Sequence, residues 1–291
     1  MPSLVFVGVG AIGLPMATRL LAAGHTVTGV DPLPAARERA RAAGLATAAR
    51  YAEAPAADVT VVMVATPEQL AALVDEALAA GVAGGCWVVM STVGPDAVRA
   101  EGARLGAAGV RVVDVPVTGG VARARTGELT LFAAGAPEDL TAVRDVLDPL
   151  GTVREVGAGL GDGQAVKVVN QHLCSVHLAA AGEALALAER LGLRPEDVLP
   201  LVEGGAAGSW MLSDRGPRML LGTDVEVTST VGIFVKDSGL VEAAARASAA
   251  ETPLLDAARR RFLLAAEAGL TDRDDSRVVE TFRAAPGAHH G

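Results

Sequence analysis

With 291 residues, of which 51% are hydrophobic and 20% charged, the chain is long enough for two domains with sizeable cores. The formal net charge of −9 and an aromatic content of 3% argue against a nucleic-acid or anionic-membrane partner. No apolar run reaches the ~20 residues that span a bilayer, and the chain opens on a strand-like run without a signal-like segment, so we expect a cytoplasmic protein.

The first half of the chain alternates short β-branched runs with Ala- and Leu-rich helical stretches. The runs lie at residues 4–7, 26–30, 59–64, 87–90 and 110–113. Each run is continuously apolar rather than alternating, which is typical of parallel strands covered by helices on both faces. The sequence therefore predicts an α/β fold with a doubly wound, parallel Rossmann sheet.

A glycine-rich turn, Gly8-Val9-Gly10-Ala11-Ile12-Gly13, connects the first predicted strand to a helix. The first two glycines permit a tight turn and the close approach of a pyrophosphate, and Gly13 permits close helix–strand packing. Asp31 ends the second predicted strand, where a carboxylate accepts the ribose hydroxyls and repels a 2′-phosphate. We therefore expect NAD rather than NADP, bound by Gly8, Gly10, Ala11, Ile12, Gly13 and Asp31. The alternative is an ordinary tight turn beside a solvated strand end.

Two polar segments lie at the ends of later predicted strands. Ala65-Thr66 follows the run at 59–64, and Ser91-Thr92 follows the run at 87–90. Open parallel sheets place their ligands at the carboxyl ends of strands, so Ala65, Thr66 and Thr92 are candidate cofactor contacts. Because Ser and Thr are also common helix N-caps, that alternative stays open for both segments.

The segment Asp114-Val115-Pro116-Val117-Thr118-Gly119-Gly120 combines a hydroxyl group with two glycines. Unshielded backbone N–H groups form a nest for anions, so Thr118, Gly119 and Gly120 are candidates for holding a substrate carboxylate. The alternative is a Gly-rich β-turn. Residues 127–134 predict a returning strand that completes the domain.

Glycines crowd the segment 157–163, and an uninterrupted helical pattern then runs from about Gln164 to about Arg190. At ~1.5 Å per residue this helix is about 40 Å long, enough to cross from one domain into another. We therefore expect three parts: a Rossmann domain at 1–162, an all-helical substrate and oligomerisation domain at 163–284, and a disordered tail at 285–291.

The long helix carries Lys167, Asn170, Gln171 and Cys174 at i, i+3, i+4 and i+7, which places a polar stripe on one face. Burying an unpaired ammonium or carboxamide is costly, so the stripe must face a cavity, a ligand or hydrogen-bonding partners. We expect Lys167 to be catalytic and Asn170 and Gln171 to contact substrate. The alternative is that Lys167 reaches solvent from the first helical turn.

Lys167 and Lys236 are the only lysines among 25 Lys and Arg residues. An amine can lose its proton whereas a guanidinium effectively cannot, so retained lysines point to sites. Lys236 is a candidate for closing the cofactor site from the second domain, with a structural ion pair to Asp237 as the alternative. Trp210 follows a Gly-rich loop and either caps the active site, in contact with substrate, or belongs to the core.

Metal and disulfide chemistry are not expected. Cys86 and Cys174 are too few for a disulfide framework or a thiolate metal site, which fits a reducing compartment. The five histidines lack the spacing His-x-x-x-His.

Over residues 3–283 the chain resembles the β-hydroxyacid dehydrogenase family, which includes 3-hydroxyisobutyrate, tartronate semialdehyde and 6-phosphogluconate enzymes. The resemblance rests on four segments in order: 8–16, 114–120, 163–170 and Lys236-Asp237. Residues 177–241 and Asp274-Asp275-Ser276 look most like L-threonate dehydrogenases. Asn170 follows the wider family and Gln171 the threonate branch, while Thr118 replaces the more usual serine.

The resemblance implies an all-helical second domain built around the long helix, Lys167 as catalytic acid/base and cofactor contact by Lys236. The expected activity is reversible, NAD-dependent oxidation of a small hydroxy acid, with threonate-like acids favoured. The alternatives are a 3-hydroxyisobutyrate enzyme, a tartronate semialdehyde reductase of the glyoxylate or succinic semialdehyde type, an imine reductase and a non-catalytic NAD-binding sensor. The Ala-rich second domain suggests a homodimer or homotetramer formed through helix packing.

Overall fold

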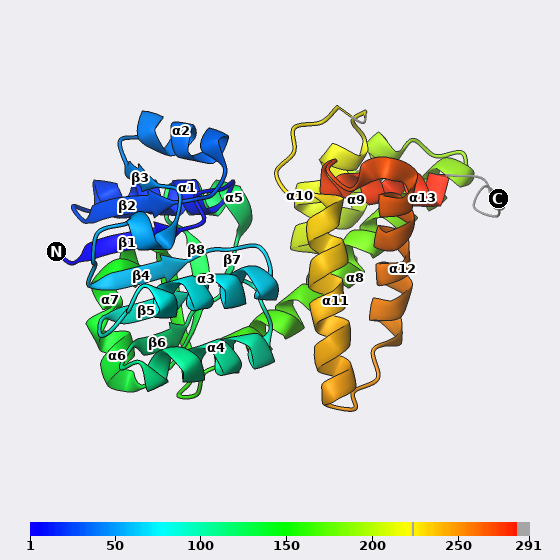
Figure 1. Ribbon diagram of the computed structural model, residues 1–291. Coiled ribbons are helices and arrows are strands. Elements are labelled where there is room, and N and C mark those ends of the chain that lie inside the picture. The colour runs from blue at the N-terminus through cyan, green and yellow to red at the C-terminus, as the bar shows by residue number, and fades with distance from the viewer. Residues whose placement is uncertain (223, 284–291) are drawn as a thin grey trace. The chain divides into compact units, whose positions relative to one another are not determined.

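The computed structural model describes residues 1–222 and 224–283, which fall into two compact units divided between Lys167 and Val168 (Figure 1). The predicted tail at 285–291 lies outside the described residues. Each unit has its own hydrophobic core.

Within the described residues, the first unit contains a sheet of nine strands in the order β3-β2-β1-β4-β5-β6-β8-β7, with β9 also paired to β8. The strands are β1 (Ser3–Val7), β2 (Thr26–Val30), β3 (Ala46–Ala48), β4 (Val59–Val62), β5 (Cys86–Val89), β6 (Arg111–Asp114), β7 (Val117–Thr118), β8 (Leu129–Ala134) and β9 (Gly151–Gly157). All pairs from β3 to β6 are parallel. The order β3-β2-β1-β4-β5-β6 is that of a dinucleotide-binding Rossmann sheet, which confirms the predicted fold class.

The five predicted runs correspond to β1, β2, β4, β5 and β6, and the returning strand corresponds to β8. Strand β8 is antiparallel to β6 and β7 but parallel to β9, so the sheet is mixed at that edge. The sequence prediction missed β3, β7 and β9. Two of these are only two or three residues long, and β9 includes the exposed, charged residues Arg154 and Glu155, so none presents a continuous apolar run.

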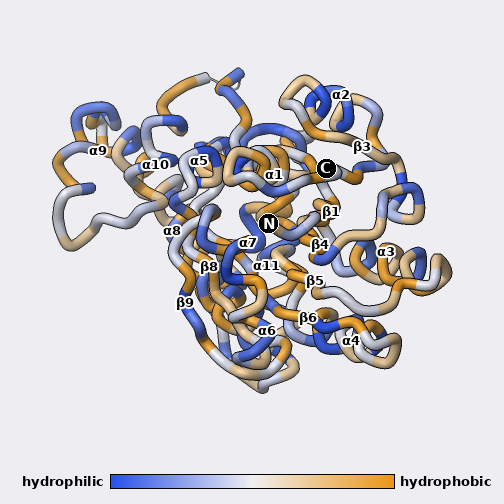
Figure 2. The backbone as a smooth tube through the Cα atoms, turned by 90° about the vertical axis from the view of Figure 1, so that its left-hand side faces the viewer, coloured by the Kyte–Doolittle hydropathy of each residue, from blue (hydrophilic) through white to orange (hydrophobic). Residues whose placement is uncertain are grey.

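Helices cover both faces of this sheet because alternate strand residues point in opposite directions. Leu4 and Phe6 of β1 share a core with Met16, whereas Val5 and Val7 share a second core with Leu70. Figure 2 shows β1, β4 and β5 as mostly hydrophobic segments. The helices of the unit are α1 (Gly13–Ala22), α2 (Pro34–Ala42), α3 (Pro67–Ala79), α4 (Pro95–Ala107), α5 (Gly120–Thr126), α6 (Pro137–Ala142) and α7 (Arg144–Leu147), with 3₁₀ turns at Tyr51–Glu53 and Asp148–Leu150.

Helix α8 (Asp162–Arg190) begins in the first unit and continues into the second, and it matches the predicted helix to within two residues. The other helices are α9 (Pro195–Glu203), α10 (Trp210–Met219), α11 (Val231–Ala247), α12 (Pro253–Ala265) and α13 (Glu280–Arg283), with a π-helical turn at Ala266–Leu270 and a 3₁₀ turn at Asp275–Val279. Their core includes Leu178, Leu185, Phe234 and Phe262. In the part of the chain that the structure describes, no helix combines the length and apolarity needed to cross a membrane.

Candidate active site

The three glycines of the turn after β1 serve different purposes. A Cβ on Gly8, whose φ is 91°, would lie 2.2 Å from the carbonyl oxygen of Met63, and a Cβ on Gly13 would lie 1.9 Å from that of Gly8. A Cβ on Gly10 would meet no heavy atom within 4 Å. The fold therefore requires Gly8 and Gly13, whereas the structure leaves space beside Gly10, as the approach of a ligand to the backbone would require.

The turn leads into helix α1 at Ile12, whose apolar side chain makes no capping hydrogen bond. A helix N-terminus without a side-chain cap presents backbone N–H groups and a partial positive charge, which together favour a phosphate group. Ala11 and Ile12 are thus placed as the sequence predicted, at the entrance of the helix.

Asp31 lies at the end of β2 and connects it to the glycine turn. Its Oδ2 accepts a hydrogen bond from the N–H of Val9 at 3.2 Å, and its Oδ1 accepts one from Leu33 at 2.9 Å. The residue is only 7% exposed, so the alternative of a solvated strand end is wrong. The guanidinium of Arg37 donates to the carbonyls of Asp31 and Pro32, at 2.7 and 2.8 Å.

The polar segments after β4 and β5 differ from each other. Thr66 is the N-cap of α3 and accepts a hydrogen bond from Gln69 N at 3.2 Å, which confirms the capping alternative for Thr66. The N–H of Ala65 donates to the Gln69 side chain at 2.7 Å. For Ser91-Thr92 the capping alternative is wrong, because α4 begins after Gly94.

Ser91 instead forms hydrogen bonds with the end of the neighbouring strand β4 and the residues after it. Its hydroxyl accepts a hydrogen bond from Val64 N at 2.8 Å and donates to the Val62 carbonyl at 3.3 Å. Thr92, the adjacent cofactor candidate, lies in the loop between β5 and α4.

Thr118, Gly119 and Gly120 lie where β7 ends and α5 begins. The φ angles of Gly119 and Gly120 are 130° and 69°, which L side chains rarely adopt. The glycines open a helix, so the alternative of a Gly-rich β-turn is wrong. A Cβ on Gly120 would meet nothing within 4 Å, so its backbone is open to a ligand in the way predicted for a carboxylate nest.

A buried network that the sequence reasoning missed joins β6 to the start of α8. The Oδ2 of Asp114 accepts hydrogen bonds from Gly161 N at 3.1 Å and Gln164 N at 2.9 Å, and its Oδ1 accepts one from the Gln164 amide at 2.9 Å. Burial raises the pKa of Asp114 to about 6, although these hydrogen bonds lower it part of the way. Both residues belong to segments that carried the family resemblance, but no sequence signal pairs them.

The rest of this network reaches the loop after β5. The Oε1 of Gln164 accepts hydrogen bonds from the N–H groups of Val93 and Gly94, both at 3.0 Å, and its Nε2 donates to the Ser91 carbonyl at 2.9 Å. We refer to Asp114, Gln164 and the loop residues 91–94 as the Asp114–Gln164 network. Glycine at 163 is required, because a Cβ there would lie 2.5 Å from the Phe132 carbonyl oxygen.

Lys167 follows Gln164 by three residues on α8, and it is 6% exposed. The alternative in which Lys167 reaches solvent is therefore wrong. Lys167 is the last residue of the first unit, and it follows Gln164 of the Asp114–Gln164 network by about one helical turn.

In the second unit, the remaining polar residues of the stripe form a chain of hydrogen bonds. The Nδ2 of Asn170 donates to Gln171 Oε1 at 2.7 Å and lies 3.4 Å from the Cys174 sulfur. The Nε2 of Gln171 donates to Asp237 Oδ2 at 2.6 Å, and Asp237 Oδ1 lies 2.7 Å from the Lys236 amine. The ion pair between Lys236 and Asp237, which was the alternative to a cofactor role for Lys236, is confirmed. Through Asp237, Lys236 is connected to Gln171 and Asn170.

Trp210 begins α10, where Ser209 is the N-cap. The indole is 48% exposed, so the alternative of a core tryptophan is wrong. The guanidinium carbon of Arg215 lies 5.7 Å from the centre of the Trp210 ring, within the range of a cation–π contact. Arg215 is in turn held by Asp275, with Nε–Oδ1 and Nη2–Oδ2 distances of 2.7 and 3.1 Å.

A second carboxylate lies beside that pair. Asp274 accepts hydrogen bonds from Nε and Nη2 of Arg218, at 3.1 and 2.6 Å, and from the N–H groups of Thr228 and Ser276. We call Asp274, Asp275, Arg215 and Arg218 the Asp274–Asp275 cluster. Both carboxylates are fully buried. The sequence singled out this segment only by resemblance.

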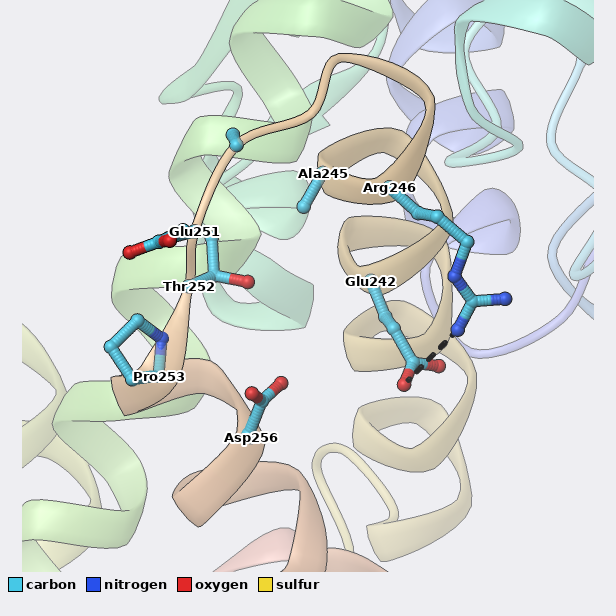
Figure 3. A pocket seen from close by; sticks show the side chains of 8 residues that line it. Glu242, Ala245, Arg246, Glu251, Thr252, Pro253 and Asp256 are labelled. Carbon is cyan, nitrogen blue, oxygen red and sulfur yellow. Dashed lines mark ion pairs between the residues drawn. The ribbon is translucent and has the colours of Figure 1, made fainter.

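Figure 3 shows a pocket of the second unit between the end of α11 and the start of α12, with Glu242, Arg246, Glu251 and Asp256 among its lining residues. The pocket contains none of the predicted site residues. Among the described residues, no group of three or more His, Cys, Asp or Glu side chains is arranged to hold a metal ion.

The predicted site residues thus fall into two sets. In the first unit, the structure joins the glycine turn to Asp31 by a hydrogen bond and places Lys167 on α8 three residues after Gln164 of the Asp114–Gln164 network. In the second unit, it assembles Asn170, Gln171 and Lys236 through Asp237, while Trp210 belongs to a separate contact with Arg215.

Comparisons with known proteins agree with these features. Residues 3–161 match the NAD-binding domain of 6-phosphogluconate dehydrogenase, and residues 161–282 match the model described as NAD-binding of NADP-dependent 3-hydroxyisobutyrate dehydrogenase. The L-threonate dehydrogenase of Cupriavidus necator is 38% identical over 281 residues, covering 95% of this chain and 94% of that protein.

Two solved structures share the whole architecture. The crystal structure of 3-hydroxyisobutyrate dehydrogenase from Salmonella typhimurium superposes with a TM-score of 0.89 at 34% identity, covering 96% of this chain and 99% of that one. The Mycobacterium tuberculosis 3-hydroxyisobutyrate dehydrogenase with L-serine has a TM-score of 0.85 at 32% identity, covering 98% and 100%. The chain therefore belongs to the β-hydroxyacid dehydrogenase family, the 3-hydroxyisobutyrate dehydrogenase-like group of NAD(P)-binding oxidoreductases that act on hydroxy acids.

Proposed function

We propose that this enzyme catalyses reversible oxidation of a small, threonate-like hydroxy acid with NAD, and that Lys167 is the acid/base. The observation that carries the proposal is the burial of this amine, one of only two lysines, on the helix whose start is held by the Asp114–Gln164 network. The relatives named L-threonate dehydrogenase support the substrate class.

Lys167 would take the hydroxyl proton of the substrate as its carbon–hydrogen bond breaks and its carbon–oxygen double bond forms. An amine acts as a general base only in its uncharged form, and removal from water favours that form. In the reverse direction the protonated amine returns the proton to the oxygen. Bound NAD would supply the hydride acceptor for this step.

The substrate carboxylate would be held by the Thr118 hydroxyl and the N–H groups of Gly119 and Gly120. Their positive φ angles and the open space beside Gly120 support this role. Asn170 and Gln171 would orient the substrate, because their amides are already fixed by hydrogen bonds to each other and to Asp237. Trp210 would contribute an exposed apolar surface that is held by Arg215.

The cofactor would be bound by Gly8, Gly10, Ala11, Ile12, Gly13 and Asp31, with further contacts from Ala65, Thr66, Thr92 and Lys236. The open space beside Gly10 and the position of Asp31 fit a dinucleotide. We infer a preference for NAD because the Asp31 carboxylate would repel a 2′-phosphate, while the Arg37 guanidinium is engaged by two backbone carbonyls. The ratio of kcat/KM for NAD and NADP tests this preference, and a higher value for NADP would contradict it.

We assign cofactor binding to residues 1–162, and substrate binding and oligomerisation to residues 163–284. Helix α8 exposes Leu173 and Leu187, at 48% and 56%, and they project from similar sides because 14 residues are about four helical turns. A homodimer or homotetramer would cover them. Light scattering of L173E and L187E variants should show dissociation, and an unchanged mass would contradict this interface. A cysteine content of two, Cys86 and Cys174, is too small for a disulfide framework and supports a cytoplasmic location.

The activity test is a screen of hydroxy acids with NAD and NADP by absorbance at the nicotinamide band. We expect turnover of threonate-like acids. Replacing Lys167 by Met should lower kcat by about 10²–10⁴-fold, the usual contribution of a general base, while NAD binding stays within about twofold. A variant that turns over at nearly the wild-type rate would refute the role of Lys167. Turnover of amines alone would favour imine reduction, and no turnover at all would favour an NAD-binding sensor.

A further inference from the structure

Gln164 uses the whole hydrogen-bonding capacity of its side-chain amide. Its Oε1 accepts two hydrogen bonds, from Val93 N and Gly94 N, and its Nε2 donates two, to the Ser91 carbonyl and Asp114 Oδ1. The side chain is completely buried. A carboxamide has two acceptor and two donor positions, so any rotation of this group would break at least one bond.

The segments that meet at Gln164 are otherwise distant in the sequence. Its partners lie 50 to 73 residues before it, in the loop 91–94 and at the end of β6. Asp114 also accepts the backbone N–H groups of Gly161 and Gln164 at the start of α8, so its carboxylate caps that helix. The rotation and height of the first turn of α8 are therefore set by contacts to two strand ends.

We propose that Gln164 is a positioning residue that holds Lys167 in register with the loop 91–94, which contains the cofactor candidate Thr92. Lys167 follows Gln164 by three residues, a rise of about 4.5 Å along the same helix, so a shift of the first turn would move the amine. The inference rests on the proposed role of Lys167. It adds that an amide outside the reacting groups decides where this amine lies.

The closest apolar substitute for this side chain is methionine, which has a similar length and favours helices. Gln164→Met removes all four side-chain hydrogen bonds and leaves the N–H groups of Val93 and Gly94 buried without this partner. Because each unmet buried group costs on the order of 1–3 kcal/mol, the first turn of α8 should open locally. Lys167 should then become more accessible to reagents.

The two lysines make this opening measurable without any enzymatic assay. Acetylation followed by cleavage at arginine places Lys167 in the peptide 155–190 and Lys236 in the peptide 219–246. In the wild-type protein Lys167 should react more slowly than Lys236, whose side chain is 25% exposed. In the Gln164→Met variant the rate at Lys167 should rise at least about fivefold, while the rate at Lys236 stays within about twofold.

His25→Leu is the matched control. His25 is also buried in the first unit, where its ring nitrogens lie 3.4 and 3.2 Å from the carbonyls of Pro2 and Asp145. Its loss should destabilise the unit without changing the acetylation rate at Lys167. Gln164→Glu, which keeps the acceptor for Val93 and Gly94 but loses the donor to Asp114, is the second variant in case methionine prevents folding, and the same direction is expected.

Kinetics then separate positioning from general stability. Gln164→Met should lower kcat at least about tenfold, with a smaller change in the dissociation constant for NAD, because of the proposed NAD contacts only Thr92 lies in the loop that Gln164 holds. An unchanged Lys167 rate, an equal increase at both lysines, or the same increase in His25→Leu would overturn the inference. If the wild-type protein oxidises no hydroxy acid, the proposed function fails, and the acetylation rates still decide the role of Gln164.

Discussion

Asp114 in the first unit and Asp274 in the second are both completely buried carboxylates, but their partners differ. Asp114 accepts hydrogen bonds from backbone N–H groups and a carboxamide, and burial raises its pKa to about 6. Burial acts in the same direction on Asp274, yet hydrogen bonds from Arg218, Ser276 and Thr228 lower its pKa to about 2. Neutral donors orient a carboxylate without offsetting its removal from water, whereas a guanidinium also provides opposite charge.

Asp275 shows that a single guanidinium does not always offset the burial of a carboxylate. Arg215 binds both of its oxygens, but burial raises the pKa of Asp275 to about 6 in spite of that cation. The loss of water therefore decides the protonation behaviour of these carboxylates unless several charged and neutral donors act together. The two groups also differ in what they connect. The Asp114–Gln164 network contacts the start of helix α8 through hydrogen bonds, whereas the Asp274–Asp275 cluster joins segments through ion pairs.

The largest loss of stability is expected when the negative charge of Asp274 is removed. Asp274→Asn leaves the Arg218 guanidinium without its buried anionic partner and should lower the free energy of unfolding of the second unit by about 3–5 kcal/mol. Urea titration followed by Trp210 emission measures it in a Trp87→Phe background. Asp224→Asn, which removes an exposed partner of Arg273, should change stability by less than about 1 kcal/mol. Equal losses in both variants would contradict the assignment.

A smaller loss of stability is expected at Asp114, whose hydrogen-bond donors are all neutral. Asp114→Asn keeps the size of the side chain but turns an acceptor oxygen into a donor facing the N–H groups of Gly161 and Gln164. The first unit should lose about 1–3 kcal/mol, measured by urea titration of Trp87 emission in a Trp210→Phe background. Asp96→Asn, at an exposed ion pair with Arg99, serves as the control. A loss larger than that of Asp274→Asn would contradict the expectation that the ion-paired carboxylate contributes more to stability.

The smallest effect concerns pH. The pKa of Asp114 is about 6 in the folded chain and 3.8 in its ordinary state, so the folded chain binds more protons between these values. Stability from this group therefore rises as pH falls from 7 toward 4, by about 1 kcal/mol between pH 7 and 5. The Trp87 transition should show this gain, and Asp114→Asn should abolish it. A gain that persists in the variant would assign the proton to another group.

The stability contributed by the Asp274 carboxylate depends on pH in the opposite direction. Because its folded pKa of about 2 lies below 3.8, its contribution is present above pH 4 and is lost as pH falls toward 2.

Features encoded by neighbouring residues were predictable. Strands β1, β2, β4, β5 and β6 were found because each is a continuous apolar run, and α8 was found because its helical pattern is long and uninterrupted. The turn at Gly8, Gly10 and Gly13 was found because tight turns and close backbone approaches leave a glycine pattern in the sequence. Lys167 was singled out as a catalytic candidate because lysine is rare in this chain.

Other features could not be predicted from the sequence. Gln164 gave no signal of its own, since its partners lie at least 50 residues away and a glutamine on a helix is ordinary in sequence. The alternatives left open at Thr66, Ser91 and Gly119 depended on where helices begin, which backbone geometry decides. The edge strands β3, β7 and β9 were missed because short or polar strands depend on the neighbour with which they pair.

The fold class and the family could be predicted from the sequence alone, and the sequence also proposed the candidate reactive groups, because hydrophobic periodicity, glycine spacing and rare residue types are local properties of the chain. Only the tertiary structure decided which groups are paired: Asp31 with Val9, Asp114 with Gln164, Gln171 with Asp237, and Arg215 with Asp275 and Trp210. Pairing and burial arise from segments distant in sequence, and they decide whether a carboxylate or an amine is held, shielded or charged.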